Sequence, residues 1–276
     1  MPFAHRLLAI LVTGLVAGLA AAAPAKADPA RVKALVADKA AAIGKIQGEQ
    51  ISELRTMAQI PAVREYFQAP EKDRPNRMEA VEKALAGRQM GSELCLIDGH
   101  GSEHLRAVRG RLAPDSELAK DEDSAPFFRA GIALPPGGLH VSIPYLSPDV
   151  EEWVVGYVVP VLPGEAILHF EHTLRELQAV ASQGTAGTGR FVLLVDPRGY
   201  VVADSRNPVA LGLTGSETEP RAYFKNIKAA DGAYPADLAA ALAARAPKEL
   251  KLRLDGKPYD VAWHEAQGLF IVGFDG

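Results

Sequence analysis

Apolar segments of strand length recur through residues 94–274, and two of them repeat one pattern 98 residues apart, at Asp98 and at Asp196. Each segment ends in Asp-x-x-Gly and is followed by a second extended segment. The pattern predicts a β-hairpin, because the turn glycine tolerates a positive φ angle between a buried strand and its return strand. An aromatic and basic cluster follows each hairpin, at 125–129 and at 221–225. The repetition indicates a duplicated structural unit.

The pattern predicts the same order of elements in both units: two strands, a crossover that carries a helix, and three further strands. This order is typical of an α+β unit, a five-stranded antiparallel sheet with helices on one side. Pro144 and Pro160 are expected at strand ends or edges, and Ser124 is expected to cap the crossover helix. The predicted elements are hairpins at 94–111 and 190–204, strands at 139–145, 153–161, 166–170, 250–254, 259–264 and 269–274, and helices at 126–132, 171–182 and 237–246.

A long helix is predicted ahead of the first unit, because apolar residues recur at three- and four-residue steps from Val32 to Met57. Gly44 and Gly48 weaken it by about 1 kcal/mol each relative to alanine. Pro61 ends or kinks it, one more turn follows at 62–67, and a short helix is predicted at 77–88. We expect the apolar stripe to face the core. The alternative is a seam for a partner protein or for a second copy of the chain.

The N-terminal residues have the pattern of a secretory signal peptide. Arg6 precedes an apolar stretch at 7–23, and Ala25-Lys26-Ala27 forms a small-x-small cleavage motif. We expect cleavage after Ala27 and a periplasmic or secreted mature protein. An uncleaved membrane anchor is the alternative, since 17 apolar residues are close to the shortest spanning length.

The Gly- and Thr-rich segment 183–189 is the expected boundary between the two units. The expected domains are a signal peptide at 1–27, the long helix at 28–68, a first unit at 69–182 and a second unit at 183–276.

Composition narrows the class of partner. The net charge of −4 becomes −6 without residues 1–27, which argues against nucleic acid because phosphate binding needs a basic surface. Cys95 is the single cysteine, so no disulfide within the chain can support the fold. Its apolar neighbours indicate a buried small hydrophobe and not a reactive thiol.

Short motifs resemble one known family. Residues 60–67 (IPAVREYF) and 96–106 (LIDGHGSEHLR), with Glu103 and Arg106 in the second, are similar to segments of the extracytoplasmic PAS-like sensors called Cache or PDC domains. The pairs at 127–128, 141–142 and 160–161 fit the same pattern. The tandem arrangement, which covers 32–276, resembles the double Cache sensors of histidine kinases, diguanylate cyclases and chemoreceptors. The resemblance implies a small-molecule sensor module that feeds signal transduction.

Members of this family usually continue into a second transmembrane helix and an output module, whereas this sequence ends at Gly276. We therefore expect a stand-alone sensor without an output domain, which signals through a membrane receptor or as a homodimer through the N-terminal helix. The alternative function is an accessory subunit that binds no ligand and docks on a membrane receptor through that helix.

The resemblance places the ligand between the sheet and the crossover. There, aromatic side chains would wall the site and an arginine would fix an anionic group. The alternative is that the crossover aromatics belong to the core and the arginine to the surface. The Arg-x-Trp-Tyr signature of the amino-acid-binding branch is absent, which weakens the case for an amino-acid ligand. The candidates are Arg106, Phe128, Arg129, Tyr145, Trp153 and Tyr157 in the first unit, and Asp204, Arg206, Tyr223 and Lys225 in the second.

No catalytic residue, metal ligand or cofactor is expected. The sequence lacks the nucleophile-elbow, zincin and phosphate-loop motifs. His100 and His104 flank a turn, and the pair His169 and His172 spans a strand end and a helix start, so helical ligand spacing does not apply. The acidic residues at 121–123 lack the spacing of a calcium loop and are expected to be a solvated surface loop.

Overall fold

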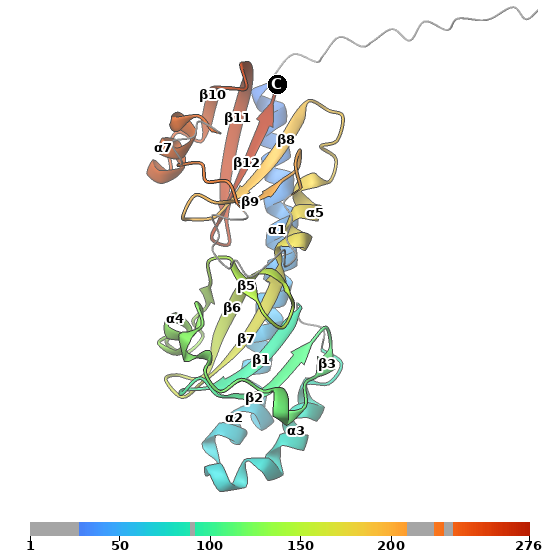
Figure 1. Cartoon of the computed structure of the whole chain (residues 1–276), viewed down its shortest axis with the longest axis vertical. Coiled ribbons are helices and arrows are strands. Elements are labelled where there is room, and N and C mark those ends of the chain that lie inside the picture. Colours follow the sequence, from blue (N-terminus) through green and yellow to red (C-terminus); the bar gives the residue numbers. More distant parts are fainter. Residues whose placement is uncertain (1–27, 89–91, 209–223, 229–233) are drawn as a thin grey trace, which may run out of the picture.

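The computed structural model describes residues 28–88, 92–208, 224–228 and 234–276, and shows two antiparallel sheets stacked along one long helix (Figure 1). The first sheet has the order β3-β2-β1-β7-β6-β4, with β5 also pairing with β6. Its strands are β1 (Glu93–Asp98), β2 (Glu103–Val108), β3 (Arg111–Leu112), β4 (His140–Val141), β5 (Tyr145–Ser147), β6 (Glu152–Leu162) and β7 (Ala166–Thr173).

The second sheet repeats the order of the first. It runs β10-β11-β12-β8-β9, which corresponds strand for strand to the path β4-β6-β7-β1-β2. The structure thus confirms the α+β fold class with two PAS-like units. Its strands are β8 (Arg190–Val195), β9 (Val201–Asp204), β10 (Glu249–Leu254), β11 (Lys257–Ala266) and β12 (Leu269–Asp275).

The first sheet has seven strands where five are predicted. β3 is a two-residue addition at one edge, and the strand predicted at 139–145 is divided into β4 and β5. Pro144 lies between β4 and β5 and has no N–H for the ladder, so it fits a break there. Pro160, in contrast, lies inside β6, where the register with β7 shifts between Pro160 and Leu162. A bulge of this kind accommodates a proline within a sheet.

Both predicted hairpins are present with matching turns. Gly101 and Gly199 have φ angles of 85° and 99°, which a side chain would strain. The carboxylates of Asp98 and Asp196 each accept a backbone N–H four residues later, at 3.1 and 2.9 Å. The register of each hairpin shifts at the residue pair before the aspartate, 96/97 and 194/195. The duplication therefore extends to the bulges and the turn hydrogen bonds.

The helices are close to those predicted. The long helix ends at 58 and α2 starts at Pro61, in agreement with the predicted break at that proline, whereas α3 ends at Leu85, three residues before the predicted end. α5 starts three residues later than predicted because β7 continues to Thr173. Ser124 does not cap α4: its hydroxyl donates to the Asp121 carbonyl, in a 3₁₀ turn ahead of the helix. The helices are α1 (Pro29–Ala58), α2 (Pro61–Gln68), α3 (Pro75–Leu85), α4 (Phe128–Ile132), α5 (Leu174–Ser182) and α7 (Ala236–Ala244).

The apolar stripe of α1 packs against both sheets within the chain. Near its start, Val36 approaches β12 so closely that a Cβ on Gly273 would lie 2.6 Å from its Cγ2. Near its end, Leu54 and Met57 are fully buried in the core of the first sheet. The core-facing interpretation of the stripe is therefore confirmed. Figure 1 shows α1 running along both sheets, with its N-terminal end beside β12.

Within the described residues, no helix has the length and apolar character needed to cross a membrane. The expected signal peptide and the candidate Tyr223 both lie outside the described residues.

Candidate functional site

A cavity of about 280 Å³ lies between the first sheet and the crossover segments that follow the first hairpin. It is on the sheet face opposite α1, where Cys95, Ile97 and Ile167 point, whereas Leu96 and Leu168 point toward α1. The lining residues are Glu93, Cys95, Asp121, Glu122, Ser124, Ala125, Pro126, Phe127, Tyr145, Leu146, Ser147, Pro148, Asp149, His169 and Glu171.

The pairing of β1 with β7 assembles the floor of this cavity. Glu93 lies opposite Glu171 in the ladder, and Cys95 lies opposite His169. Alternate residues of a strand share a face, so both cross-strand pairs project to the cavity side. All four side chains are buried, with relative exposures between 1 and 4%. Two carboxyls, a thiol and an imidazole therefore sit together in the interior.

Tyr145, which lines the same cavity, holds the imidazole of His169 in place. Its hydroxyl donates to Glu171 Oε1 at 2.7 Å and lies 2.9 Å from His169 Nε2. A hydroxyl has one proton to donate, so it accepts from Nε2–H and leaves the lone pair of the imidazole on Nδ1. The Phe127 ring stacks on the imidazole at 3.6 Å. A Cβ on Gly156 would lie 2.8 Å from Nε2 and 2.9 Å from the Tyr145 hydroxyl, so glycine is needed here for space.

Several buried polar atoms of this floor have no hydrogen-bond partner among the described residues. Cys95 Sγ donates to Glu93 Oε1 at 2.8 Å, but Glu93 Oε2, Glu171 Oε2 and His169 Nδ1 are unpaired. Leaving a buried polar atom without a partner costs about 1–3 kcal/mol. A concentration of such atoms on one cavity is a feature of a site that completes its hydrogen bonds or coordination with a ligand.

Burial shifts the protonation of these groups toward their neutral forms. Burial, reinforced by the facing carboxyl of Glu171, raises the pKa of Glu93, and burial raises the pKa of Glu171. Burial raises the pKa of the Cys95 thiol and lowers the pKa of His169 to about 3. The imidazole is therefore neutral at neutral pH, with its Nδ1 lone pair free to accept a hydrogen bond or bind a cation.

The mouth of the cavity is acidic. Asp121, Glu122 and Asp149 line it, and burial followed by repulsion from neighbouring carboxylates raises the pKa of Glu122 to about 7. The guanidinium of Arg106, on the cavity side of β2, is held by Asp149 at 2.9 Å and Glu103 at 3.5 Å. Within the described residues, the lining contains five carboxyl groups and neither lysine nor arginine. The electrostatic character of the site favours a cation.

Solved structures similar to the chain belong to extracellular sensors. The extracellular domain of a protein assigned as a histidine kinase, vpHK1S-Z8, has a TM-score of 0.62 at 11% identity, over 89% of this chain and 90% of that one. The ligand-binding domain of the Pseudomonas fluorescens chemoreceptor CtaA, in complex with L-alanine, has a TM-score of 0.57 at 15% identity, over 89% and 95%. The Vibrio cholerae histidine kinase DctB sensor domain has a TM-score of 0.57 at 11% identity, over 90% and 96%.

The chain has the double Cache fold. No family model matches the sequence, and no match is found among curated proteins. The three solved structures, an extracellular domain, a ligand-binding domain and a sensor domain, agree with the fold that the motifs at 60–67 and 96–106 imply.

Of the residues predicted for the first Cache unit, Tyr145 lines the cavity. Phe128 lies next to it, buried in a cluster with Cys95 and Ile97. Arg129 is exposed on α4 and is not among the lining residues. Arg106 is on the cavity side, opposite Cys95 in the hairpin, but it is held in its ion pairs. These placements do not bring an arginine into the cavity.

Trp153 and Tyr157 lie on the other face of the sheet, so the prediction that they wall the site with Tyr145 is corrected. Tyr157 stacks on Phe170 at 4.7 Å in the core under α1, and Trp153 meets Phe224 edge-to-face at 4.8 Å. Trp153 and Tyr157 are four residues apart and therefore share one face of β6, whereas Val158 is on the other face and packs toward α4. Their large aromatic rings fill the interior between sheet and helix.

Of the candidates in the second Cache unit, the structure describes Asp204, Arg206 and Lys225, and none of them lines the cavity described for that unit. Asp204 is buried and pairs with Arg206 at 3.2 Å, and the Arg206 guanidinium lies 3.8 Å from the centre of the Phe191 ring. Lys225 is exposed. A cavity of about 270 Å³ in this unit is lined by other residues, among them Asp196 and Arg245.

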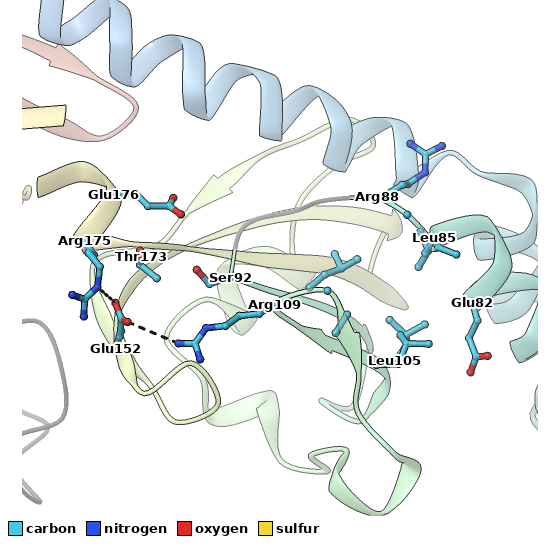
Figure 2. A pocket seen from close by; sticks show the side chains of 16 residues that line it. Glu82, Leu85, Arg88, Ser92, Leu105, Arg109, Glu152, Thr173, Arg175 and Glu176 are labelled. Carbon is cyan, nitrogen blue, oxygen red and sulfur yellow. Dashed lines mark hydrogen bonds and ion pairs between the residues drawn. The ribbon is translucent and has the colours of Figure 1, made fainter. Parts of the chain in front are cut away.

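A larger cavity of about 620 Å³ lies at the edge of the first sheet, next to α3 and the start of α5 (Figure 2). Two of its arginines already have a partner: Arg109 and Arg175 both point to Glu152, at 3.8 and 3.0 Å. Both arginine side chains are about two-thirds exposed, so water screens them. The smaller cavity, with its buried and unpaired atoms, is the stronger candidate site.

Sequence reasoning missed Glu93, Glu171 and His169. Glu93 opens β1 and Glu171 lies near the end of β7, where a carboxylate ordinarily indicates an exposed strand end. His169 and His172 point to opposite faces of β7: His172 lies 3.2 Å from Gln50 on α1 and 2.9 Å from Glu176. The sequence does offer one signal for His169: it lies two residues after the apolar Ile167, so the two side chains point to the same face of the strand.

Proposed function

We propose that this chain is an extracytoplasmic sensor module that binds a small cation in the cavity of its first Cache unit. Export by a signal peptide cleaved after Ala27, to the periplasm or beyond, is part of the proposal. The sensory neighbours support it, since two of them, CtaA and the Campylobacter jejuni chemoreceptor Tlp3, are solved with amino acids.

One observation carries the proposal: the unpaired atoms of Glu93, His169 and Glu171 converge on a cavity between sheet and crossover. A ligand that donates hydrogen bonds or carries positive charge satisfies these acceptors and recovers the free energy lost by burying them.

The proposed ligand is positively charged, whereas the candidate Arg129 suggested an anionic ligand. An α-amino acid would offer its ammonium group to Glu171, but its carboxylate would meet Asp149 and Glu122 at the mouth. Arg106 cannot compensate, because its guanidinium is committed to Glu103 and Asp149. The lining therefore favours simple cations over zwitterions and organic acids.

The apolar stripe of α1 supports sensing over docking. Its side chains are buried between the helix and both sheets, so a partner that took this stripe would have to open the core. A receptor or a second copy would instead contact the polar face of α1.

A ligand panel read by thermal unfolding tests the proposal. With a chelator present, primary amines and diamines are expected to raise the melting temperature, and organic acids are not; a ligand at 100 times its Kd adds about 2.7 kcal/mol. Glu171→Gln removes a buried acceptor and is expected to abolish the shift, whereas the matched change at exposed Glu117, Glu117→Gln, leaves it intact. Shifts with organic acids alone would contradict a cationic ligand.

A further inference from the structure

Three side chains of the cavity floor are arranged as metal ligands. One ligating atom from each of Glu93, Cys95 and His169 lies within 4.8 Å of those of the other two, and all three residues are buried. The residues come from two adjacent strands, with Cys95 directly opposite His169 and two positions from Glu93. Rigid paired strands hold ligands more accurately than loops do.

The hydrogen bonds around these groups leave the metal-binding atoms available. The Tyr145 hydroxyl, which donates to Glu171, takes the Nε2–H of His169 and thereby leaves Nδ1 with its lone pair. His169 Nδ1 and Glu93 Oε2 are buried and have no partner within the described structure. In metal sites a ligating histidine typically donates its other N–H to a second group, which fixes the ring and its tautomer.

We propose that Glu93, Cys95 and His169 bind a late first-row transition metal ion, with Zn²⁺ the best fit, as the cation sensed in this cavity. The inference rests on the proposed function, because it names the class of ligand for the same site. Thiolate, imidazole and carboxylate together are a zinc ligand set, whereas Mg²⁺ and Ca²⁺ select oxygen ligands alone.

Glu171 is available to complete the coordination. It faces Glu93 across the ladder, its Oε1 is held by Tyr145, and its Oε2 is unpaired. On binding, the Cys95 thiol and a protonated Glu93 release their protons to water, and the thiolate and carboxylate together balance the charge of a divalent ion. The carboxylates of Asp149 and Glu122 at the mouth attract the ion toward the floor.

The proposal predicts selective binding of Zn²⁺ by the full chain after removal of metal with a chelator. Isothermal titration with Zn²⁺ is expected to give one site per chain, while Mg²⁺ and Ca²⁺ give none. His169→Gln and Cys95→Ser are each expected to weaken Zn²⁺ binding at least about 10-fold. His264→Gln, which removes an exposed histidine of the second unit, serves as the matched control and keeps the wild-type affinity.

Co²⁺ provides a readout that does not depend on folding stability. Bound to the wild-type chain, Co²⁺ is expected to show a thiolate-to-metal charge-transfer band, which Cys95→Ser removes. Tyr145→Phe keeps all three ligands but removes the group that positions His169. It is expected to retain the band and to lower the affinity about 10- to 100-fold. Circular dichroism of each variant shows whether it is folded.

The outcomes separate this inference from the proposed function. If Zn²⁺ does not bind but amines stabilise the chain, the metal site is overturned and cation sensing stands. Zn²⁺ binding that His169→Gln and Cys95→Ser leave unchanged also overturns the site, because the ion is then held elsewhere. If neither Zn²⁺ nor any amine binds, both proposals fail. Zn²⁺ binding that both variants lose, with the Co²⁺ band, supports both.

Discussion

Tyr145 and His169 show how single residues define the chemistry of the cavity. The tyrosine hydroxyl joins an imidazole to a carboxyl, and this junction requires Gly156, since a Cβ there would overlap both partners. Phe127 closes the other side of the imidazole by stacking. The polar groups are therefore held in fixed positions before any ligand arrives, which lowers the cost of binding.

Glu122 gives a prediction on pH dependence. Its pKa rises from an ordinary value of 4.5 to about 7 in the folded chain, so the folded state holds a proton that the unfolded state has released between these values. Stability is therefore lost as the pH rises through this range. Glu122→Gln removes the loss. Because Glu122 is only partly buried and water screens its carboxyl, we expect a gain of about 1–2 kcal/mol over the unmodified chain at about pH 8 and no gain at about pH 4.

Urea unfolding at the two pH values measures this difference. Glu117→Gln, at an exposed position of the same crossover, is the control and is expected to show no such pH-dependent gain. Equal gains for Glu122→Gln at both pH values would show that its carboxyl titrates alike in the folded and unfolded states.

The sequence identifies Tyr145 but not the rest of the site, and the reason is physical. Every residue of β6 after Glu152 is buried, because α1 covers one face and the crossover the other. The usual alternation of apolar and polar residues is then absent, so the faces of Trp153 and Tyr157 cannot be assigned from the pattern. Glu93 and Glu171 become neighbours only through the β1–β7 pairing, which a single sequence does not reveal.

At the scale of elements, the hairpins were predictable because their turn chemistry is local. Asp98 and Gly101 act within four residues, and the same holds for Asp196 and Gly199. Strand ends depend on longer-range pairing and were less well predicted. β7 extends into the segment predicted as helix because Thr173 pairs with Val154 on β6.

The first hairpin turn gives a prediction on stability. Gly101→Ala combines a φ angle of 85° with a Cβ that would lie 2.4 Å from the Asp123 backbone nitrogen. Gly137→Ala, the matched control, has a φ angle of 75° and nothing within 4 Å. We expect the control to lose about 1–2 kcal/mol from backbone strain. Gly101→Ala should lose about 1–3 kcal/mol more from overlap. Equal losses in urea unfolding would show that the crossover yields without cost.

For the molecule as a whole, α1 joins the two units into one core. Asp275 on β12 accepts from Arg31 Nε at 3.0 Å, and Gln50 contacts His172 on β7. Between these points Lys39 donates to the Val180 carbonyl at 2.7 Å, which ties α1 to α5. The helix thus contacts both sheets and the segment that connects them.

The two tryptophans test whether the units unfold together. Trp153 reports on the first sheet and Trp263 on the second, so Trp263→Phe and Trp153→Phe each leave one local fluorophore. Because α1 is shared, both probes are expected to give one denaturation midpoint. Leu54→Ala, which empties a fully buried position near the first sheet, is expected to cost about 2–5 kcal/mol and to lower both midpoints equally. A shift at Trp153 alone would show that the units unfold independently.

The path of α1 also determines how the chain can be dissected. The strands of the second sheet lie within residues 190–276, but α5 packs on β8 and β9, and α1, which lies at the other end of the sequence, packs on β11 and β12. Expressing that stretch by simple truncation would leave the face under these helices bare to solvent and invite aggregation. An autonomous version has to be assembled from two separated pieces of the gene, with residues 28–46 grafted back onto the sheet through a designed linker.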